Sequence, residues 1–99
     1  MNGRPREYLP CKEREEYILY VRAAGFALKT ECQRNRHIND FVRLAQSMSS
    51  RWTVRDVDTD DVLRYAKHIK RTSKNVGTAR VKLNLVINWL RWLKQTERI

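Results

Sequence analysis

Residues 83–93 read LNLVINWLRWL, and this apolar run decides the fold class. It contains the longest apolar stretch of the chain, residues 85–93, which Asn88 and Arg91 interrupt. A run of this length and polarity is expected in a core helix rather than across a bilayer. No proline lies between Cys11 and Ile99, and no alternating strand pattern flanks an Asn-Gly or Asp-Gly turn. The sequence therefore predicts an all-α domain.

A helix over about residues 78–94 would be buried on two sides. Counted at about 100° per residue from Ala79, one apolar stripe lies within about 80° of that residue and a second lies near 200–280°. The first stripe holds Leu83, Val86, Ile87, Leu90 and Leu93, and the second holds Val81, Leu85, Trp89 and Trp92. The remaining arc holds Arg80, Asn84, Asn88 and Arg91. Arg hydrogen-bonds guanine edges and phosphates, and Asn hydrogen-bonds adenine edges, so this arc suits a DNA major groove. The plain alternative is the solvated face of a core helix.

Three further helices are predicted upstream. The first covers about residues 12–26, with Gly25 at its end, where a left-handed conformation costs glycine least. Its helical spacing is carried by Tyr17, Ile18, Tyr20, Val21 and Ala24. The second runs from about Thr30 to Met48, with one stripe formed by Ile38, Phe41, Val42, Ala45 and Met48. After an extended connector over residues 51–57, the third begins with Thr59 as its N-cap and ends near Arg71. Residues 1–11 are expected to be a flexible lead and residues 12–99 the folded domain.

The charge balance predicts a polyanionic partner. The chain has 99 residues, a net charge of +10 and a pI of about 10.2. Between Arg64 and Lys82 there are seven basic residues and no acidic one, namely Arg64, Lys67, Lys70, Arg71, Lys74, Arg80 and Lys82. Nucleic acid is the first candidate partner, an acidic protein the second and an anionic membrane the third.

The second helix is expected to add to a nucleic-acid-binding face. Opposite its apolar stripe lie Gln33, Arg36, Asn39, Asp40 and Arg43. Asp40 would repel phosphate, so only part of this face could contact a backbone. The start of the helix carries Lys29, Thr30, Gln33 and Arg34, near free amide groups that attract phosphate.

No motif for catalysis, metal binding or cofactor binding is recognised. Residues 56–61 open like a calcium loop, but Asp61 stands where that loop needs glycine and Lys67 where it needs glutamate. A capped helix start explains these acids better. The two cysteines and two histidines lack zinc-ligand spacing, and no glycine-rich phosphate loop is present. The chain has no apolar leader, so an intracellular protein with no membrane partner is expected.

The order of these elements resembles the N-terminal core-binding, SAM-like domain of tyrosine recombinases, the phage integrase family. The matching residues extend over most of the chain: Thr30, Ile38, Phe41, Val57, Thr59, Asp61, Val62, Tyr65, Ile69, Thr78, Arg80, Leu83, Val86, Trp89 and Leu90. One departure is the stretch at residues 34–37, RNRH, which stands where the family has an aromatic tyrosine in the second helix. The catalytic arginine, lysine, histidine and tyrosine of the family belong to a different half of those enzymes.

The resemblance implies a compact four-helix domain that clamps duplex DNA at a core-type recombination site, beside other recombinase protomers. Helices two and four would lie over adjacent major-groove edges, and the Trp stripe would pack on helices one and three. Lys74, Asn75 and Thr78 would hold phosphates at the start of helix four. Such a domain would bind DNA without cutting it, in the cytoplasm of a bacterium or from a phage gene. The candidate DNA-binding residues are Lys29, Thr30, Gln33, Arg34, Arg36, Arg43, Lys70, Lys74, Asn75, Thr78, Arg80, Asn84, Asn88 and Arg91. A protein-interaction module with an acidic partner and an RNA-binding module are the two alternatives.

Overall fold

Four helices form the domain in a computed structural model, which describes residues 8–99. They are α1 (Lys12–Ala23), α2 (Leu28–Met48), α3 (Thr59–Thr72) and α4 (Val76–Gln95), and a short 3-10 helix, η1 (Val54–Asp56), precedes α3. Residues 8–99 contain no strand, so the predicted all-α, four-helix architecture is confirmed. The radius of gyration of 13.3 Å is that of a compact domain of this length. No helix between residues 8 and 99 is both long and apolar enough to cross a bilayer.

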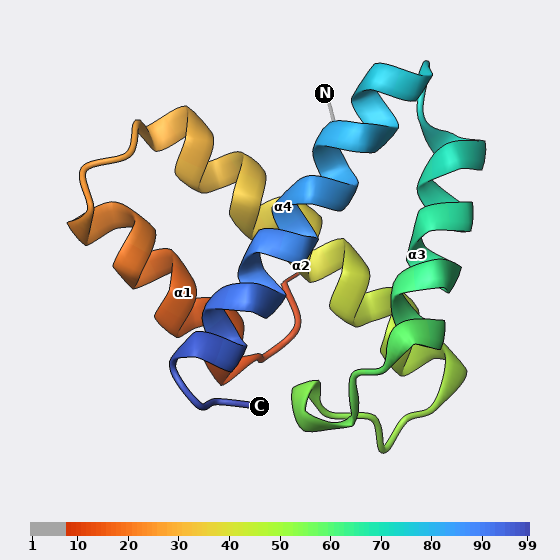
Figure 1. Cartoon of the computed structure of the whole chain (residues 1–99), viewed down its shortest axis with the longest axis horizontal. Helices are drawn as coiled ribbons and strands as arrows, with labels where there is room; N and C mark the ends of the chain where they lie inside the picture. The colour runs from red at the N-terminus through yellow and green to blue at the C-terminus, as the bar shows by residue number, and fades with distance from the viewer. Residues whose placement is uncertain (1–7) are drawn as a thin grey trace.

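Helix α4 is the central element of the fold. In Figure 1 it runs diagonally across the front of the molecule, with α2 passing behind it, α1 on one side and α3 on the other. It packs against all three of these helices. No other helix lies in front of α4 in this view, so α4 contributes to the core with one side and leaves another side open.

The core is built around the apolar side chains of α4. Trp89 is fully buried, as are Val86 and Leu93. The Trp89 ring lies 6.3 Å from that of Phe41 on α2, and its Nε1–H donates to the carbonyl of Glu13 on α1 over 3.4 Å. The expectation that the Trp stripe packs on helices one and three is therefore corrected to helices one and two. Val81 is also corrected, because its side chain is 55 % exposed and not buried with that stripe.

The helix ends differ from the predicted ones by a few residues, and local capping explains the differences. Helix α1 ends at Ala23, and Gly25 follows in the expected left-handed conformation with φ of +84°. Tyr20 is half exposed rather than in the core. Helix α4 starts at Val76 instead of Thr78, because Asn75 is its N-cap and accepts a 2.8 Å hydrogen bond from the Thr78 amide.

The acidic residues before α3 form a capping network, as the sequence indicated. Asp58, not Thr59, is the N-cap: its side chain accepts from the Asp61 amide at 3.0 Å, and Asp61 accepts in return from the Asp58 amide at 3.0 Å. The Asp61 carboxylate also accepts from the Trp52 indole at 3.1 Å and from Arg64 at 3.2 Å. Asp61 is buried, so it ties the start of α3 to the connector. The connector itself contains η1 and is not wholly extended.

Replacing Asp61 with alanine is expected to destabilise the domain by about 2–3 kcal/mol, since it removes a cap and leaves the Trp52 indole without its acceptor. Asp60→Ala is the matched control, because Asp60 is an exposed neighbour of the same charge in the same helical turn. Its loss should cost about 0.5 kcal/mol, the weak interaction of one exposed acid with the helix dipole. Urea denaturation measures both values. Equal midpoints for the two variants would show that the Asp61 network does not stabilise the fold.

Part of the expected N-terminal lead packs on the domain. Residues 1–7 of that lead lie outside the described residues. Cys11 is buried, which raises the pKa of its thiol, and the Leu9 amide donates to Asn39 over 3.0 Å. Arg14 is buried too and donates to the Leu9 carbonyl at 3.0 Å. Asn39 is completely buried, so its predicted place on the open face of helix two is wrong: it holds the chain before α1.

An ion pair joins the end of α1 to the start of α2. Arg22 donates through Nε and Nη2 to the two carboxylate oxygens of Glu31, at 3.0 and 2.9 Å. Hydrogen bonding to Arg22 lowers the pKa of Glu31 below its ordinary value of 4.5 and raises the pKa of Arg22. The pair therefore stabilises the folded protein above about pH 4.5, and this stabilisation is lost as the pH falls through the lowered pKa.

Glu31→Gln is expected to lower the urea midpoint at pH 7, and the gap from the unmodified protein should close below pH 4.5. The measurement is a series of urea titrations between neutral pH and about pH 3, a range set by the ordinary glutamate pKa. Glu97→Gln, at an exposed position, is the control and should leave the midpoint unchanged. A Glu31→Gln gap that stays constant over this range would contradict the depressed pKa.

Candidate nucleic-acid interface

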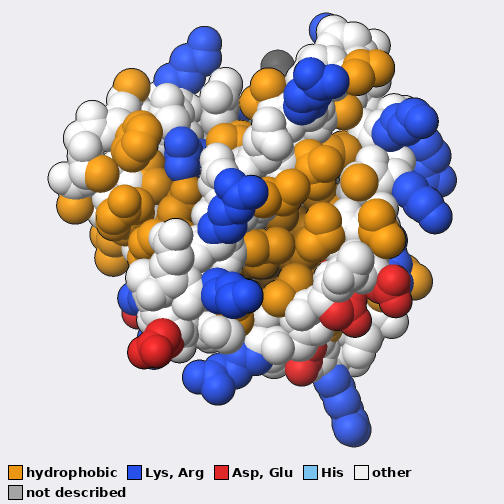
Figure 2. Space-filling view, in the orientation of Figure 1, with side chains coloured by type: hydrophobic (Ala, Val, Ile, Leu, Met, Phe, Trp, Pro, Cys, Tyr) orange, Lys and Arg blue, Asp and Glu red, His pale blue; other side chains and the backbone are white. Residues whose placement is uncertain are grey.

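Positive charge dominates the half of the chain that forms α3 and α4. Between Asp61 and Glu97 there is no acidic residue and there are nine basic ones. Figure 2 shows Asp and Glu only toward the lower part of the molecule, whereas Lys and Arg side chains are spread across the face that α4 presents. This asymmetry gives the α4 side of the domain a positive potential that attracts polyanions.

The uncovered side of α4 carries the predicted Arg and Asn residues, which we call the α4 strip. All four members are exposed: Arg80, Asn84, Asn88 and Arg91. The angular prediction of an exposed strip is therefore confirmed, while its role in DNA binding stays a prediction. From Arg80 to Arg91 the strip is about 16 Å long at the usual helical rise. Neither arginine forms a hydrogen bond or ion pair with any residue of the range 8–99.

The loop between α3 and α4 adds further positive charge at one end of the strip. Lys74 is exposed in this loop and Lys70 in the last turn of α3, and both line the same depression as Arg80. Because the Asn75 side-chain oxygen caps the Thr78 amide, only its NH₂ group is available to a phosphate. The amides of Val76 and Gly77 have no acceptor among the described residues, and such first-turn amides attract anions.

The same loop borders an apolar depression between α3 and α4. It has a volume of about 420 Å³, with Lys70, Lys74 and Arg80 at its rim. Its apolar lining is formed by Ala66, Ile69, Val76, Ala79 and Leu83. Figure 2 shows the corresponding apolar surface beside α4, with Lys and Arg side chains around it. This depression could accept an apolar side chain of a partner, with a negatively charged group of the same partner beside it.

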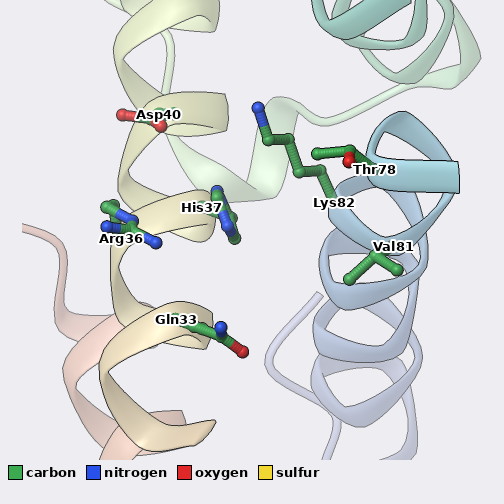
Figure 3. Close-up of a pocket in the computed structure, with 7 residues that line it drawn as sticks. All are labelled: Gln33, Arg36, His37, Asp40, Thr78, Val81 and Lys82. Carbon is green, nitrogen blue, oxygen red and sulfur yellow. The ribbon is translucent and has the colours of Figure 1, made fainter. Parts of the chain in front are cut away.

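A groove between α2 and α4 brings residues of the two helices together (Figure 3). It has a volume of about 400 Å³ and is lined by Gln33, Arg36, His37, Asp40, Thr78, Val81 and Lys82. Gln33 and His37 point toward α4, whereas Arg36 and Asp40 lie on the far side of α2. The groove thus unites three of the predicted residues, from both predicted helices. His37 and Lys82 were missed, although each lies one helical turn beyond a predicted residue of the same helix.

The remaining predicted residues do not join this groove. Arg34 donates to the Tyr17 hydroxyl at 2.6 Å, and its guanidinium lies 4.8 Å from the Phe26 ring centre. These contacts within the protein use part of its hydrogen-bonding capacity. Arg43 lines a separate depression beside Asp40, with His68 of α3. Lys29 is exposed at the start of α2, and Thr30 is half-buried there. The predicted set is therefore one helical strip with flanking groups, and not a single continuous surface.

Neither a metal site nor a similar protein points to a function. Within the described part of the chain, no three His, Cys, Asp or Glu side chains lie close enough together to hold a metal ion. Comparison of the chain with protein-family models, with curated proteins and with solved structures found no match. The α4 strip and its flanking groups are therefore the grounds for a functional proposal.

Proposed function

We propose that this domain binds duplex DNA, with the α4 strip in the major groove and the loop before α4 on the phosphate backbone. The observation that carries the proposal is the strip itself: two Arg and two Asn side chains, exposed on one side of a helix that Val86, Trp89 and Leu93 anchor in the core. A helix with its side chains is about 10–12 Å wide, which matches the width of the B-DNA major groove.

The shape of the nucleic acid favours DNA over RNA as the partner of this helix. The major groove of A-form RNA is too deep and narrow for side chains to reach the base edges. A strip of Arg and Asn on an exposed helix is suited to the wider groove of DNA, where both residue types hydrogen-bond bases. Competition between duplex DNA and structured RNA tests this choice, and displacement of the DNA by an equal amount of RNA would favour the RNA alternative.

The resemblance in element order extends the proposal to a biological role. The domain would act as the noncatalytic core-binding part of a tyrosine recombinase, in the cytoplasm, on a core-type recombination site and beside other protomers. Supporting it are the four helices in the expected order and the exposure of Arg80 at the start of α4. In this role the domain supplies affinity and sequence preference, and strand cleavage belongs to residues outside it.

Two single substitutions should separate backbone contact from base recognition. Lys74→Ala is expected to weaken binding to every duplex about fivefold at physiological salt and to reduce the salt slope by about 0.9. Asn84→Ala is expected to lower the preference for a selected sequence over a random one by about fivefold or more, with little change of slope. A binding site selected from a random duplex pool supplies the preferred sequence. Lys12→Ala, an exposed lysine on α1, is the control and should change neither quantity.

A second candidate function is the binding of an acidic protein. The depression between α3 and α4 favours it, because an apolar lining with a basic rim suits an amphipathic helix that carries Asp or Glu. Leu83→Ala is expected to weaken such binding by removing apolar contact and to leave DNA affinity nearly unchanged, since it alters no charge and Leu83 lies outside the α4 strip. Loss of partner binding after nuclease treatment would instead assign the interaction to nucleic acid.

A further inference from the structure

An aromatic pocket lies where the end of α1, the start of α2 and the second half of α4 meet. It has a volume of about 270 Å³. Four rings, two guanidinium groups and two carboxamides line it: Tyr17, Tyr20, Phe26, Trp92, Arg34, Arg91, Asn88 and Gln95. Asn88 and Arg91 also belong to the α4 strip, so the pocket continues directly from the surface proposed to hold duplex DNA.

Three rings of this pocket contact one another, and the fourth, that of Phe26, lies 4.8 Å from the Arg34 guanidinium. The centre of the Trp92 ring lies 5.1 Å from that of Tyr17 and 5.6 Å from that of Tyr20, and the two tyrosines are stacked 6.1 Å apart. The Arg98 guanidinium also lies over the Trp92 ring, 4.4 Å from its centre. Tyr20 and Phe26 nevertheless remain 50 % and 45 % exposed. Rigid rings with this much open surface are suited to stack on a planar ligand.

The polar groups around the rings select a negatively charged ligand. Arg34 is positioned by its hydrogen bond to Tyr17, and its Nε is buried without an acceptor among the described residues. Arg91 is exposed at the pocket edge, and no carboxylate lines the pocket. Two guanidinium groups would repel the quaternary ammonium ligands that other aromatic pockets bind. The carboxamides of Asn88 and Gln95 offer both donors and acceptors to a heteroaromatic edge.

We propose that this pocket binds one unpaired nucleotide. Its base stacks on the open surface of Tyr20 and Phe26, the carboxamides of Asn88 and Gln95 meet the base edge, and Arg91 holds the phosphate. The inference rests on the proposed function, because a strand leaving the duplex at the Arg91 end of the α4 strip would enter the pocket. The domain would then recognise the junction between paired and unpaired DNA, beyond recognising the duplex.

The test compares two duplexes of the same paired sequence, one blunt and one with a single-stranded overhang whose first base is the fluorescent analogue 2-aminopurine. The overhang duplex is expected to bind about fivefold to a hundredfold more tightly, the range of base stacking on aromatic residues. Its fluorescence should be quenched on binding. Tyr20→Ala and Phe26→Ala should remove both effects and leave the affinity for the blunt duplex unchanged.

Matched variants keep the outcome decisive. Leu19→Ala, at an exposed apolar neighbour that does not line the pocket, should retain the overhang preference. Tyr20→Leu keeps apolar bulk but removes the ring, so it should lose the preference even if Tyr20→Ala loosens α1. Equal binding of the two duplexes without quenching would overturn the nucleotide pocket and leave duplex binding intact. Failure of the blunt duplex to bind would instead overturn the proposed function.

Discussion

Reversing the charge of Lys74, Arg80 and Arg91 together is expected to lower the affinity for duplex DNA at least about a hundredfold at physiological salt. Each phosphate contact releases a counterion, which is worth about fivefold in affinity at that salt concentration. Three glutamates would lose these contacts and repel the backbone. All three side chains are exposed, and none pairs with a carboxylate of the described residues, so the fold should tolerate the changes.

A matched variant separates the α4 face from the overall charge. Reversal of Lys12, Arg51 and Arg55, which are also exposed, changes the net charge by the same amount at positions outside the proposed DNA face. Fluorescence anisotropy with a labelled duplex should show a much smaller loss for this control. Circular dichroism should show the same helix content for both variants. If the variant at Lys74, Arg80 and Arg91 binds like the unmodified protein, the proposed DNA face is wrong.

Trp89→Ala is expected to have the largest effect on stability, about 3–5 kcal/mol. Trp89 is completely buried, packs edge-on against Phe41 and donates a hydrogen bond to the α1 backbone. Its removal would leave a cavity where α4 meets α1 and α2. A domain of this length has a total stability of about 5–15 kcal/mol, so the variant should be partly unfolded or close to it at 37 °C.

The control for this substitution is Val81→Ala, on the same helix but 55 % exposed. It should change the free energy of unfolding by about 0.5 kcal/mol or less. Guanidinium denaturation at 25 °C measures both variants. A loss of under about 1 kcal/mol for Trp89→Ala, well below the range for buried aromatic residues, would contradict a core centred on this side chain.

The fold and the α4 strip could be predicted because both depend on spacing within single helices. The angular count placed Arg80 and Asn84 on an open face, as found. The angular count failed at Val81. Burial of that side of α4 depends on how closely α2 approaches α4, and the groove between the two helices leaves Val81 exposed. The capped start of α3 was also anticipated, but Asp58 and Thr59 are both good caps. The Asp61 network with Trp52 decides between them.

Features made by residues far apart in the chain could not be predicted in this way. Asn39 looked solvent-facing because its partner, the Leu9 amide, precedes it by 30 residues. The contribution of α2 to the site depends on the rotation of that helix relative to α4, which turns Gln33 toward the groove and Arg36 away. The aromatic pocket combines Tyr20, Phe26 and Trp92 from three segments. Spacing along one helix could not reveal that juxtaposition.

The most direct measurement is the affinity of the unmodified protein for duplex DNA as the salt concentration is raised from about 50 to about 300 mM. Binding through the α4 strip and the loop before it involves four basic groups: Lys70, Lys74, Arg80 and Arg91. DNA binding through this face predicts a log–log slope between about −3 and −5. Absence of binding at the lowest salt, or an affinity that does not change with salt, would contradict it.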